Sequence, residues 1–392
     1  MKEYTTLEKV ASIYNGNSIN AEYKKQHFVG LKTGYPFIGT KDVSFEGVVD
    51  YNNGVRIPYN TDYKTAEPDS VFICAEGGSA GRKIAYINEK VCFGNKLFCI
   101  KPKKNIYIGK FLYYYLMSNA FQTQFKLMLT GLIGGVSAKK FKSFTIPILE
   151  ITEQERIVAF LDADFEKIDQ LKANAAVQLQ AAKDLFQNAV SESLSMRNTW
   201  ESKKLKDLCS ICGEYGLNES ATEYNGVRYL RITDITADGE LNDDLVSSLH
   251  TTDKKQSKLE EGDILFARTG ATVGKTLVYR EEFGDCEFAG YLIRYRTNPH
   301  IILPKYLFYV THSADYYKWV IENQTTATQP NISAQKYNSL IINFPHDVNE
   351  QQKIIDKLDN IFENCKQLQS NYDQTLTLCN DLKQALLKSI FE

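Results

Sequence analysis

Several kinds of segment are missing from this 392-residue sequence. No run of apolar residues approaches the ~20 that a helix needs to cross a bilayer. The first ten residues, MKEYTTLEKV, have no apolar stretch of the kind that a secretory signal contains. We therefore expect a cytoplasmic protein that makes no use of a membrane.

Cysteine and histidine form no recognisable site. The eight cysteines belong to a long chain without an export signal, which predicts reduced thiols rather than disulfides. Cys209 and Cys212 make one CxxC, but no second pair and no nearby histidines complete a zinc site. We interpret them as small residues at the start of an element, with metal or redox use as the alternative. The five histidines are scattered, so we expect no metal.

Motifs of several enzyme classes are also missing. The segment Gly270–Thr276 resembles a Walker A loop, but only three residues separate its glycines, where that loop needs four to wrap the phosphates. The nearest approach to the Asn/Asp-Pro-Pro-aromatic tetrapeptide of aminomethyltransferases is Asn298-Pro299-His300, which lacks the second proline. No glycine-rich cofactor loop follows a strand near the start. We expect neither a catalytic centre nor a bound cofactor in this chain.

Charge is distributed unevenly, although the net charge is only −2. Residues 1–148 hold 20 Lys/Arg against 11 Asp/Glu, whereas residues 199–345 hold 16 against 20. An excess of positive charge favours a polyanionic partner, because phosphate contacts supply most of the non-specific affinity for DNA. Charge alone leaves a solvated basic surface as the alternative. In residues 199–345, any DNA contact must come from a local patch.

The chain is a repeat of itself. Matching landmarks keep one order, and their offset stays between 192 and 198 residues. The matched pairs are Leu7–Val10 with Leu205–Leu208, Tyr35–Val43 with Val227–Ile235, Ser70–Ile87 with Asp263–Arg280, Lys110–Ser118 with Lys305–Ser313, Ser137–Phe141 with Ser333–Tyr337, and Glu153–Ile157 with Glu350–Ile354. We therefore infer that the chain consists of two copies of one module, each with a mixed globular part and a helical tail.

Each globular part has an α+β pattern, and each tail has a coiled-coil pattern. Ser70–Ala75 and Asp263–Ala267 are rich in strand-forming residues, while Lys110–Ser118 and Lys305–Ser313 predict helices. From Ile354 to Ser389 apolar residues follow a 4-3 spacing, and a looser version runs from Ile157 to Ala189. Neither tail contains Pro or Gly, so each predicts a helix of ~60–65 Å.

The ordered, duplicated motifs resemble the specificity subunit of type I restriction–modification enzymes. They are the P…EQ(E/Q)(R/K)I helix opening, the glycine-and-basic loop, the K(F/Y)L(Y/F)Y helix and the SA(K/Q)K(F/Y) segment before an exit strand. The resemblance covers essentially all 392 residues. It implies an α+β fold of two tandem pseudo-symmetric target-recognition domains, separated by two long antiparallel coiled-coil helices. The expected segments are domain 1 at 1–148, a central helix at 149–198, domain 2 at 199–345 and a C-terminal helix at 346–392.

The resemblance also implies a function without catalysis in this chain. Each domain would recognise one half of a bipartite, asymmetric sequence in double-stranded DNA. The length of the helices would fix the number of unread base pairs between the two halves, the spacer. Two methyltransferase subunits, which would hold S-adenosylmethionine, would bind the coiled coil and methylate adenine. Motor-nuclease subunits would add restriction. A coiled-coil scaffold with two protein-binding domains is the alternative, slightly favoured by the acidic second module.

Three loop regions of each module offer side chains suited to DNA. Base recognition needs Arg, Lys, amides or hydroxyls on loops, with glycines that let the backbone approach closely. Arg82, Lys83, Arg268 and Lys275 are predicted phosphate or guanine contacts. The full set of candidates is Thr40, Lys41, Gly77, Gly78, Ser79, Arg82, Lys83, Ser137, Lys139, Lys140, Arg231, Thr233, Arg268, Thr269, Gly270, Thr272, Lys275, Thr328, Gln329, Asn331 and Ser333.

Four of the polar residues in these regions have a structural interpretation as well. Ser137 and Ser333 fit the N-cap of a short helix as well as they fit a DNA contact. For Asp42 and Asp234, a turn or capping role is favoured over recognition of cytosine.

Overall fold

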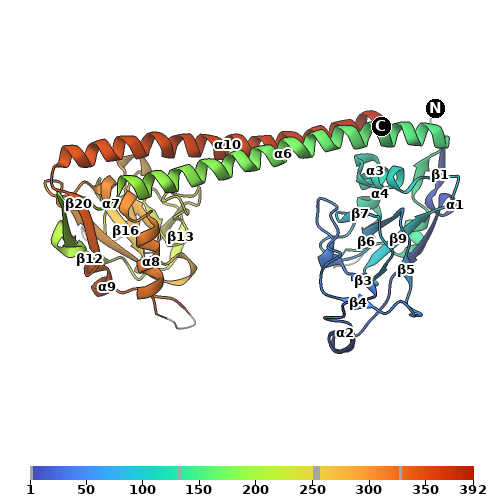
Figure 1. Ribbon diagram of the computed structural model, residues 1–392, viewed down its shortest axis with the longest axis horizontal. Helices are drawn as coiled ribbons and strands as arrows, with labels where there is room; N and C mark the ends of the chain where they lie inside the picture. Colours follow the sequence, from blue (N-terminus) through green and yellow to red (C-terminus); the bar gives the residue numbers. More distant parts are fainter. Residues whose placement is uncertain (1–2, 130–133, 250–256, 326–328) are drawn as a thin grey trace. The chain divides into compact units, whose positions relative to one another are not determined.

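A computed structural model describes residues 3–129, 134–249, 257–325 and 329–392. Internal contacts divide the chain into two units, described here separately (Figure 1). Unit 1 comprises Met1–Ala175 with Asp373–Glu392, and unit 2 comprises Ala176–Tyr372. Each unit therefore contains one globular part and segments of both long helices.

Unit 1 is built on a four-stranded antiparallel sheet in the order β2-β9-β6-β7. Its strands are β2 (Ala11–Asn15), β9 (Leu97–Pro102), β6 (Ser70–Cys74) and β7 (Ile84–Ile87). A second sheet has the order β4-β3-β8-β5, with β4 (Arg56–Ile57), β3 (Tyr35–Ile38), β8 (Val91–Phe93) and β5 (Thr65–Ala66). β1 (Tyr4–Thr6) pairs with β10 (Thr145–Pro147). The helices are α1 (Leu7–Val10), α2 (Ala21–His27), the 3-10 helix η1 (Thr40–Asp42), α3 (Gly109–Met117), α4 (Asn119–Met128) and α5 (Ala138–Lys142).

Unit 2 repeats this arrangement. Its main sheet has the corresponding order β12-β19-β16-β17, with β12 (Cys209–Tyr215), β19 (Leu292–Thr297), β16 (Asp263–Ala267) and β17 (Thr276–Val278). The parallel pair β14 (Arg228–Leu230) and β18 (Cys286–Phe288) corresponds to β3 and β8, which are also parallel. The other strands are β11 (Trp200–Lys204), β20 (Ile341–Pro345), β13 (Ala221–Glu223) and β15 (Val246–Ser248). The helices are η2 (Leu205–Leu208), η3 (Gly270–Thr272), η4 (Glu281–Phe283), α7 (Pro304–Val310), α8 (Ala314–Asn323) and α9 (Ala334–Asn338).

One of the two inner strands of each main sheet, β6 or β16, is buried on both faces, which explains its nearly continuous apolar sequence. In β6, Val71 and Ile73 join the core under α3, whereas Phe72 and Cys74 join the core shared with the second sheet. β16 divides in the same way, with Phe266 on the helix side and Leu265 on the other. The predicted strands and helices at these positions are confirmed.

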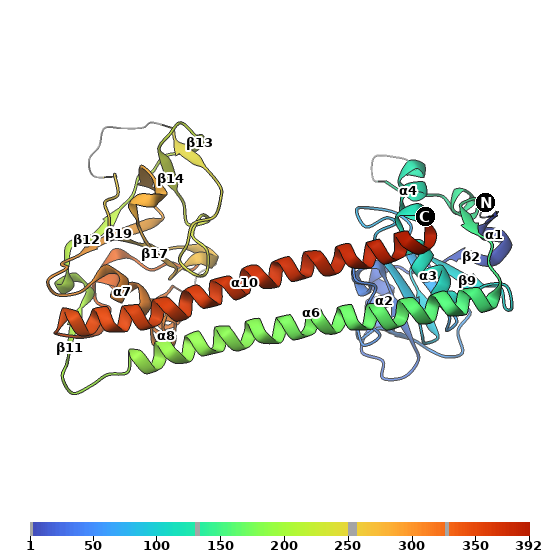
Figure 2. The same cartoon turned by 90° about the horizontal axis from the view of Figure 1, so that it is seen from above.

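Two long helices follow the globular parts, α6 (Ile151–Ser193, 43 residues) and α10 (Val348–Phe391, 44 residues). Within each unit they run side by side and antiparallel (Figure 2). In unit 1, Lys383 Nζ lies 2.6 Å from Asp169 and Lys172 Nζ lies 2.6 Å from Asn380. In unit 2, the Cys365 thiol donates to the Ala182 carbonyl at 3.2 Å. Among the described residues, no helix is long and apolar enough to span a membrane.

The predicted apolar seam is buried at many of its positions, including Leu179 and Cys379, and exposed at others. Leu161 and Leu358 are fully buried, because α3 and α7 cover them. Leu171, Leu368 and Leu382 belong to the same spacing, yet they are 55%, 37% and 48% exposed. Two helices without a third neighbour cannot enclose every side chain of the seam.

Candidate nucleic-acid interface

In unit 1, the structure brings the three predicted loop regions together. The Gly77 N–H donates to the Gly134 carbonyl at 2.8 Å, and the Val136 N–H donates to the Ala75 carbonyl at 3.1 Å. The Lys83 ammonium donates to the carbonyl of Thr40 at 2.8 Å. Segments that lie far apart in the sequence therefore form one surface, which contains residues 40–41, 76–83 and 134–140.

Unit 2 joins its copies of these loops with equivalent bonds. The Gly270 N–H donates to the Pro330 carbonyl at 2.9 Å, and Thr269 forms a β-bridge with Asn331. Lys275 donates to the carbonyl of Ile235 at 3.1 Å, in the segment that corresponds to the Thr40 region of unit 1 although not at the matching residue. The predicted contact Thr328 lies outside the described residues.

The loop glycines differ in what surrounds them. Gly81 and Gly274 have φ of 72° and 88°, and an added Cβ would lie 2.5 Å from Phe125 and 2.9 Å from Val320 respectively. These two glycines are needed for the turn and for packing. In contrast, a Cβ on Gly77 or Gly78 would have no neighbour within 4 Å. The backbone at Gly77 and Gly78 is therefore open to the approach of a ligand.

Five of the predicted basic residues fall into two groups. Lys83 and Lys275 hold loops together through carbonyls, and Arg231 forms ion pairs with Asp234 at 2.7 Å and Asp244 at 3.8 Å. Two other arginines lie over aromatic rings. Arg82 lies 4.9 Å from the Phe45 ring centroid, and Arg268 lies 4.8 Å from that of Tyr215. The stacked arginines keep a charge that no carboxylate among the described residues neutralises.

Four residues had both a DNA-contact and a structural interpretation, and the structure shows that each of them accepts a hydrogen bond from a nearby backbone N–H. Ser137 Oγ accepts from the Lys140 N–H and Ser333 Oγ accepts from the Lys336 N–H, at 3.4 and 3.3 Å. Asp42 and Asp234 each accept the N–H three residues earlier at 2.8 Å, as expected for turn residues. Lys139 and Lys140 are exposed on α5 beside the capped end.

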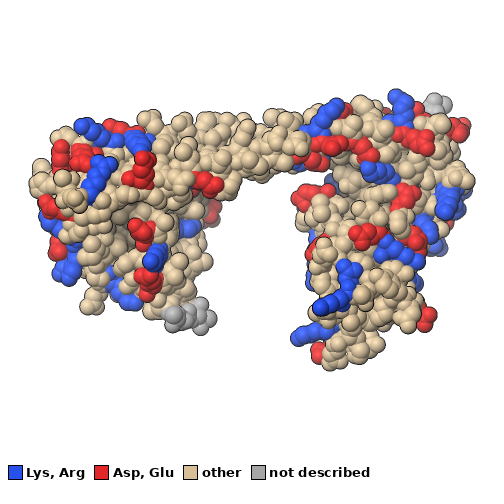
Figure 3. Space-filling view, in the orientation of Figure 1, with Lys and Arg blue, Asp and Glu red and all other residues tan. Residues whose placement is uncertain are grey.

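A basic cavity of about 240 Å³ in unit 1 adds residues that the sequence did not single out. The added residues are Lys24, Lys96, Asn17 and Asn95, which line the cavity beside the predicted contact Lys41 and the carboxylate of Asp42. Lys24 comes from α2, a helix with no buried residue. Figure 3 shows Lys and Arg side chains over the region of α2, β3 and β4. The sequence signal was the Asn20 N-cap followed by Lys24 and Lys25, in a segment that the second repeat lacks.

The helix-opening motif of each repeat contains a buried glutamine that joins helix to domain. Gln154 Nε2 donates to the carbonyls of Ile106 and Leu149, at 2.9 and 2.8 Å. Gln351 Nε2 donates to those of Ile301 and Pro345, at 2.8 and 2.9 Å. Sequence reasoning used this motif as a landmark but missed its structural role, although its duplication was visible.

A Lys–Asp–Tyr cluster makes a second joint in each unit. Lys110 and Tyr114 of α3 contact Asp162 of α6 at 2.6 and 2.5 Å. Lys305 of α7 contacts Asp359 of α10 at 2.7 Å, and the Tyr309 hydroxyl donates to the same carboxylate. Burial, reinforced by the carboxylate, raises the pKa of Tyr309 well above its usual value, so the hydroxyl stays a donor.

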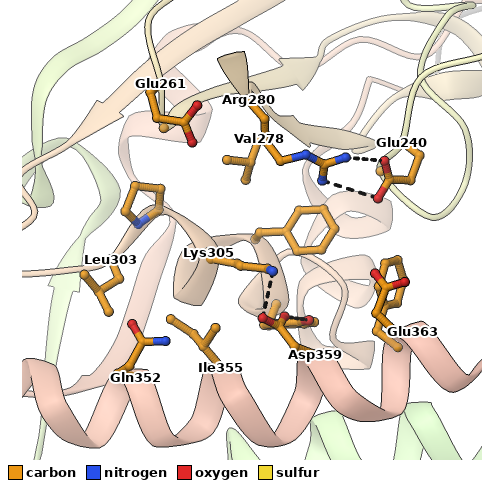
Figure 4. Close-up of a pocket in the computed structure, with 16 residues that line it drawn as sticks. Glu240, Glu261, Val278, Arg280, Leu303, Lys305, Gln352, Ile355, Asp359 and Glu363 are labelled. Carbon is orange, nitrogen blue, oxygen red and sulfur yellow. Dashed lines mark hydrogen bonds and ion pairs between the residues drawn. The ribbon is translucent and has the colours of Figure 1, made fainter. Parts of the chain in front are cut away.

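This second joint of unit 2 borders a cavity of about 490 Å³ (Figure 4). Arg280 points to Glu240, both residues line the cavity, and Lys366 pairs with the same carboxylate. Burial alone would raise the pKa of Glu240, but hydrogen bonds from Arg280 and Lys366 hold it below its usual range. The charges are paired with one another, as suits a joint between a domain and a helix. Within the part of the chain that the structure describes, no three His, Cys, Asp or Glu residues form a possible metal site.

The family model for the type I restriction modification DNA specificity domain matches residues 2–180 and 197–378. The chain belongs to this family. The two matched ranges coincide with the two repeats, so the resemblance inferred from the duplicated motifs is confirmed, as is the α+β fold class.

Curated members of the specificity family match nearly the whole chain. The StySPI specificity subunit of Salmonella potsdam is 23% identical over 401 residues, covering 94% of this chain and 84% of the relative. The EcoKI specificity subunit of Escherichia coli K12 is 24% identical over 400 residues, with the same coverage. Membership makes the chain a non-catalytic specificity protein, in agreement with the missing enzyme motifs.

Solved structures from type I restriction–modification systems share the fold. One, described as the structural basis of complex assembly and conformational transition of the type I R-M system, has a TM-score of 0.76 at 17% identity and covers 100% of this chain and 97% of that chain. The HsdS subunit from Thermoanaerobacter tengcongensis has a TM-score of 0.54 at 17% identity, with coverage of 99% and 96%.

Proposed function

We propose that this chain recognises a bipartite, asymmetric sequence in double-stranded DNA and directs adenine methylation by two partner methyltransferase subunits in the cytoplasm. The observation that carries the proposal is the convergence of the same three loop regions in both units, with different side chains in each. Two domains with the same scaffold but different loop side chains are suited to recognising two different half-sites. S-adenosylmethionine would be held by the partners, and motor-nuclease subunits would add restriction.

The proposed DNA contacts are the loop residues predicted from the sequence. Arg82 and Arg268 have the strongest support, because their guanidinium groups lie over aromatic rings and no described carboxylate pairs with them. Gly77 and Gly78 would let a phosphate approach the backbone closely. Lys83, Lys275 and Arg231 would act mainly by shaping the loops, since each is already engaged inside its unit.

The long helices would carry the methyltransferase subunits. Leu171, Leu378 and Leu382 of unit 1 are 55%, 67% and 48% exposed, and Val177 and Leu185 of unit 2 are 68% and 60% exposed. Figure 3 shows few charged side chains on the middle part of α6 and α10, on the face in view. Exposed apolar side chains in such a stretch favour contact with another protein. We also propose that the functional segments are the two recognition domains at 1–148 and 199–345 and the two helices at 149–198 and 346–392.

DNA binding by the reconstituted complex tests this function. We expect sequence-dependent affinity that weakens steeply with salt, by about 10³–10⁵-fold between 50 and 200 mM for six to ten phosphate contacts. The measurement is fluorescence anisotropy on a duplex library, with the methyltransferase subunits alone as control. A coiled-coil scaffold with two protein-binding domains, which the acidic second module slightly favours, would show no salt-dependent binding to DNA.

A further inference from the structure

We propose that Arg268 recognises a guanine of the second half-site in the major groove, with Tyr215 and Asn331 as the residues that hold it in position. The inference rests on the proposed function and makes it specific at one position. It adds Tyr215 to the site, and it assigns Arg268 to a base edge rather than to the DNA backbone.

Arg268 differs from every other arginine of unit 2 in its surroundings. The terminal nitrogens of the other six arginines bond to acceptors inside the unit. Their acceptors are Glu350 for Arg197, Asn242 for Arg228, Asp234 for Arg231, Glu240 for Arg280, Glu214 for Arg294 and Asp263 for Arg296. Among the described residues, the two terminal nitrogens of Arg268 have no hydrogen bond or ion pair. A guanidinium with open donors suits a ligand from outside.

The remaining atoms of Arg268 are fixed. Its Nε donates to Asn331 Oδ1 at 3.3 Å, and the guanidinium lies over the Tyr215 ring. Tyr215 is itself held, because its hydroxyl accepts the Ala334 N–H at 3.0 Å, although the residue is 44% exposed. The backbone of Arg268 bonds on both sides, to Tyr291 at 3.0 Å and Ile332 at 2.9 Å. A side chain ordered in advance loses less entropy when it binds.

A fixed fork of two N–H donors matches the edge of guanine. Guanine presents the O6 and N7 acceptors side by side in the major groove, and arginine contacts both at once. Lysine, with a single flexible ammonium group, does not reproduce this geometry. The restraints on Nε and on the ring plane favour such a fixed pair of acceptors over a phosphate, which accepts from many directions.

Unit 1 has no such fork at the corresponding position. The Ala75 N–H donates to the Lys96 carbonyl and its own carbonyl accepts from Val136, which are the same two bonds that Arg268 makes with Tyr291 and Ile332. The counterparts of Arg268 and Asn331 are therefore Ala75 and Gly135. The counterpart of Tyr215 is Asn15, because each precedes a glycine that packs against two backbone carbonyls of the same loop. Asn15, Ala75 and Gly135 line a cavity of about 330 Å³. The two units must recognise their half-sites differently at this point.

The test replaces each guanine of the second half-site, one at a time, with 7-deazaguanine, which lacks the N7 acceptor. The full complex with its methyltransferase subunits is titrated with these duplexes. For the unmodified chain we expect about a 10-fold loss of affinity at one guanine. For Arg268→Ala and Arg268→Lys, natural DNA should bind more weakly and the substitution at that guanine should have no further effect. Tyr215→Leu should retain a smaller effect at the same guanine.

Arg82→Ala is the matched control, because it removes the stacked arginine of the other unit and should leave the 7-deazaguanine effect unchanged. Thermal unfolding confirms that each variant is folded, and Arg268→Lys preserves the charge. The proposal is wrong if Arg268→Ala retains the full 7-deazaguanine effect, or if the second half-site contains no guanine. It is also wrong if Arg268→Ala weakens binding to all sequences equally and lowers the slope of log affinity against log salt concentration by about one. That result would indicate a phosphate contact. Absence of sequence-specific binding by the unmodified complex would instead refute the proposed function.

Discussion

Gln154 and Gln351 make the same three hydrogen bonds in the two units. Each side-chain amide donates to two carbonyls, and each Oε1 accepts a backbone N–H, from Ile108 at 3.1 Å and from Leu303 at 2.9 Å. Both residues are fully buried. A buried amide that satisfies three backbone groups fixes the start of a helix against the loop before α3 or α7.

Gln351→Leu should therefore destabilise unit 2 strongly. Leucine fits the volume but leaves one N–H and two carbonyls without a partner, at a cost of about 3 kcal/mol or more in the free energy of unfolding. Urea denaturation followed by circular dichroism measures this change. Gln352→Leu is the control, because Gln352 is exposed and should change stability little. Equal stability of the two variants would contradict the role of Gln351.

Removal of the four loop charges at Arg82, Lys83, Arg268 and Lys275 should abolish methylation directed by the complex and leave subunit assembly intact. The two arginines should account for most of the loss of DNA affinity, since the two lysines are bonded to carbonyls. Methylation of a target plasmid and size-exclusion chromatography of the complex measure the two properties. Unchanged methylation would exclude these loops from the interface.

His312 should make unit 2 sensitive to mild acid. Its ring is buried and bonds to the Phe308 carbonyl at 2.8 Å, and burial lowers its pKa below the usual value. Because the unfolded chain binds the proton more readily, this contribution to stability is present above about pH 6.5 and declines as the pH falls. The slope should reach at most about 1.4 kcal/mol per pH unit.

The variant His312→Met separates this effect from other titrations. Methionine is the residue at the matching position 117 of the first repeat, so the packing should tolerate it. Denaturation curves between pH 5 and 7.5 should show a smaller pH dependence for the variant than for the unmodified chain. Identical slopes would mean that His312 takes no part.

Much of the fold could be predicted because the chain contains it twice. Matching landmarks fixed the repeat, and the apolar runs at Ser70–Cys74 and Asp263–Ala267 identified the central strands. The serine caps also followed from local chemistry. The partners of the charged residues could not be predicted, because Arg231 and Arg268 have the same charge in the sequence but differ in whether an aspartate lies beside them. The role of Tyr215 depends on residues 53 and 116 positions away in the chain.

Lengthening the helices should lengthen the unread part of the DNA target. Seven residues added to α6 after Ala175 and seven added to α10 after Tyr372 would extend each helix by about 10.5 Å while keeping the apolar spacing. At about 3.4 Å per base pair, we expect a spacer longer by about three base pairs. Sequencing of methylated sites measures the spacer. An unaltered spacer would contradict the idea that helix length sets it.

The most direct measurement is a long-read methylome of a methylation-free host that expresses this chain with its partner methyltransferase subunits. We predict methylated adenines in one split motif with two different half-sites, and no methylated motif when this chain is left out. A methylated motif that persists without the chain, or a soluble and assembled complex that methylates no motif, would contradict sequence recognition by these two units.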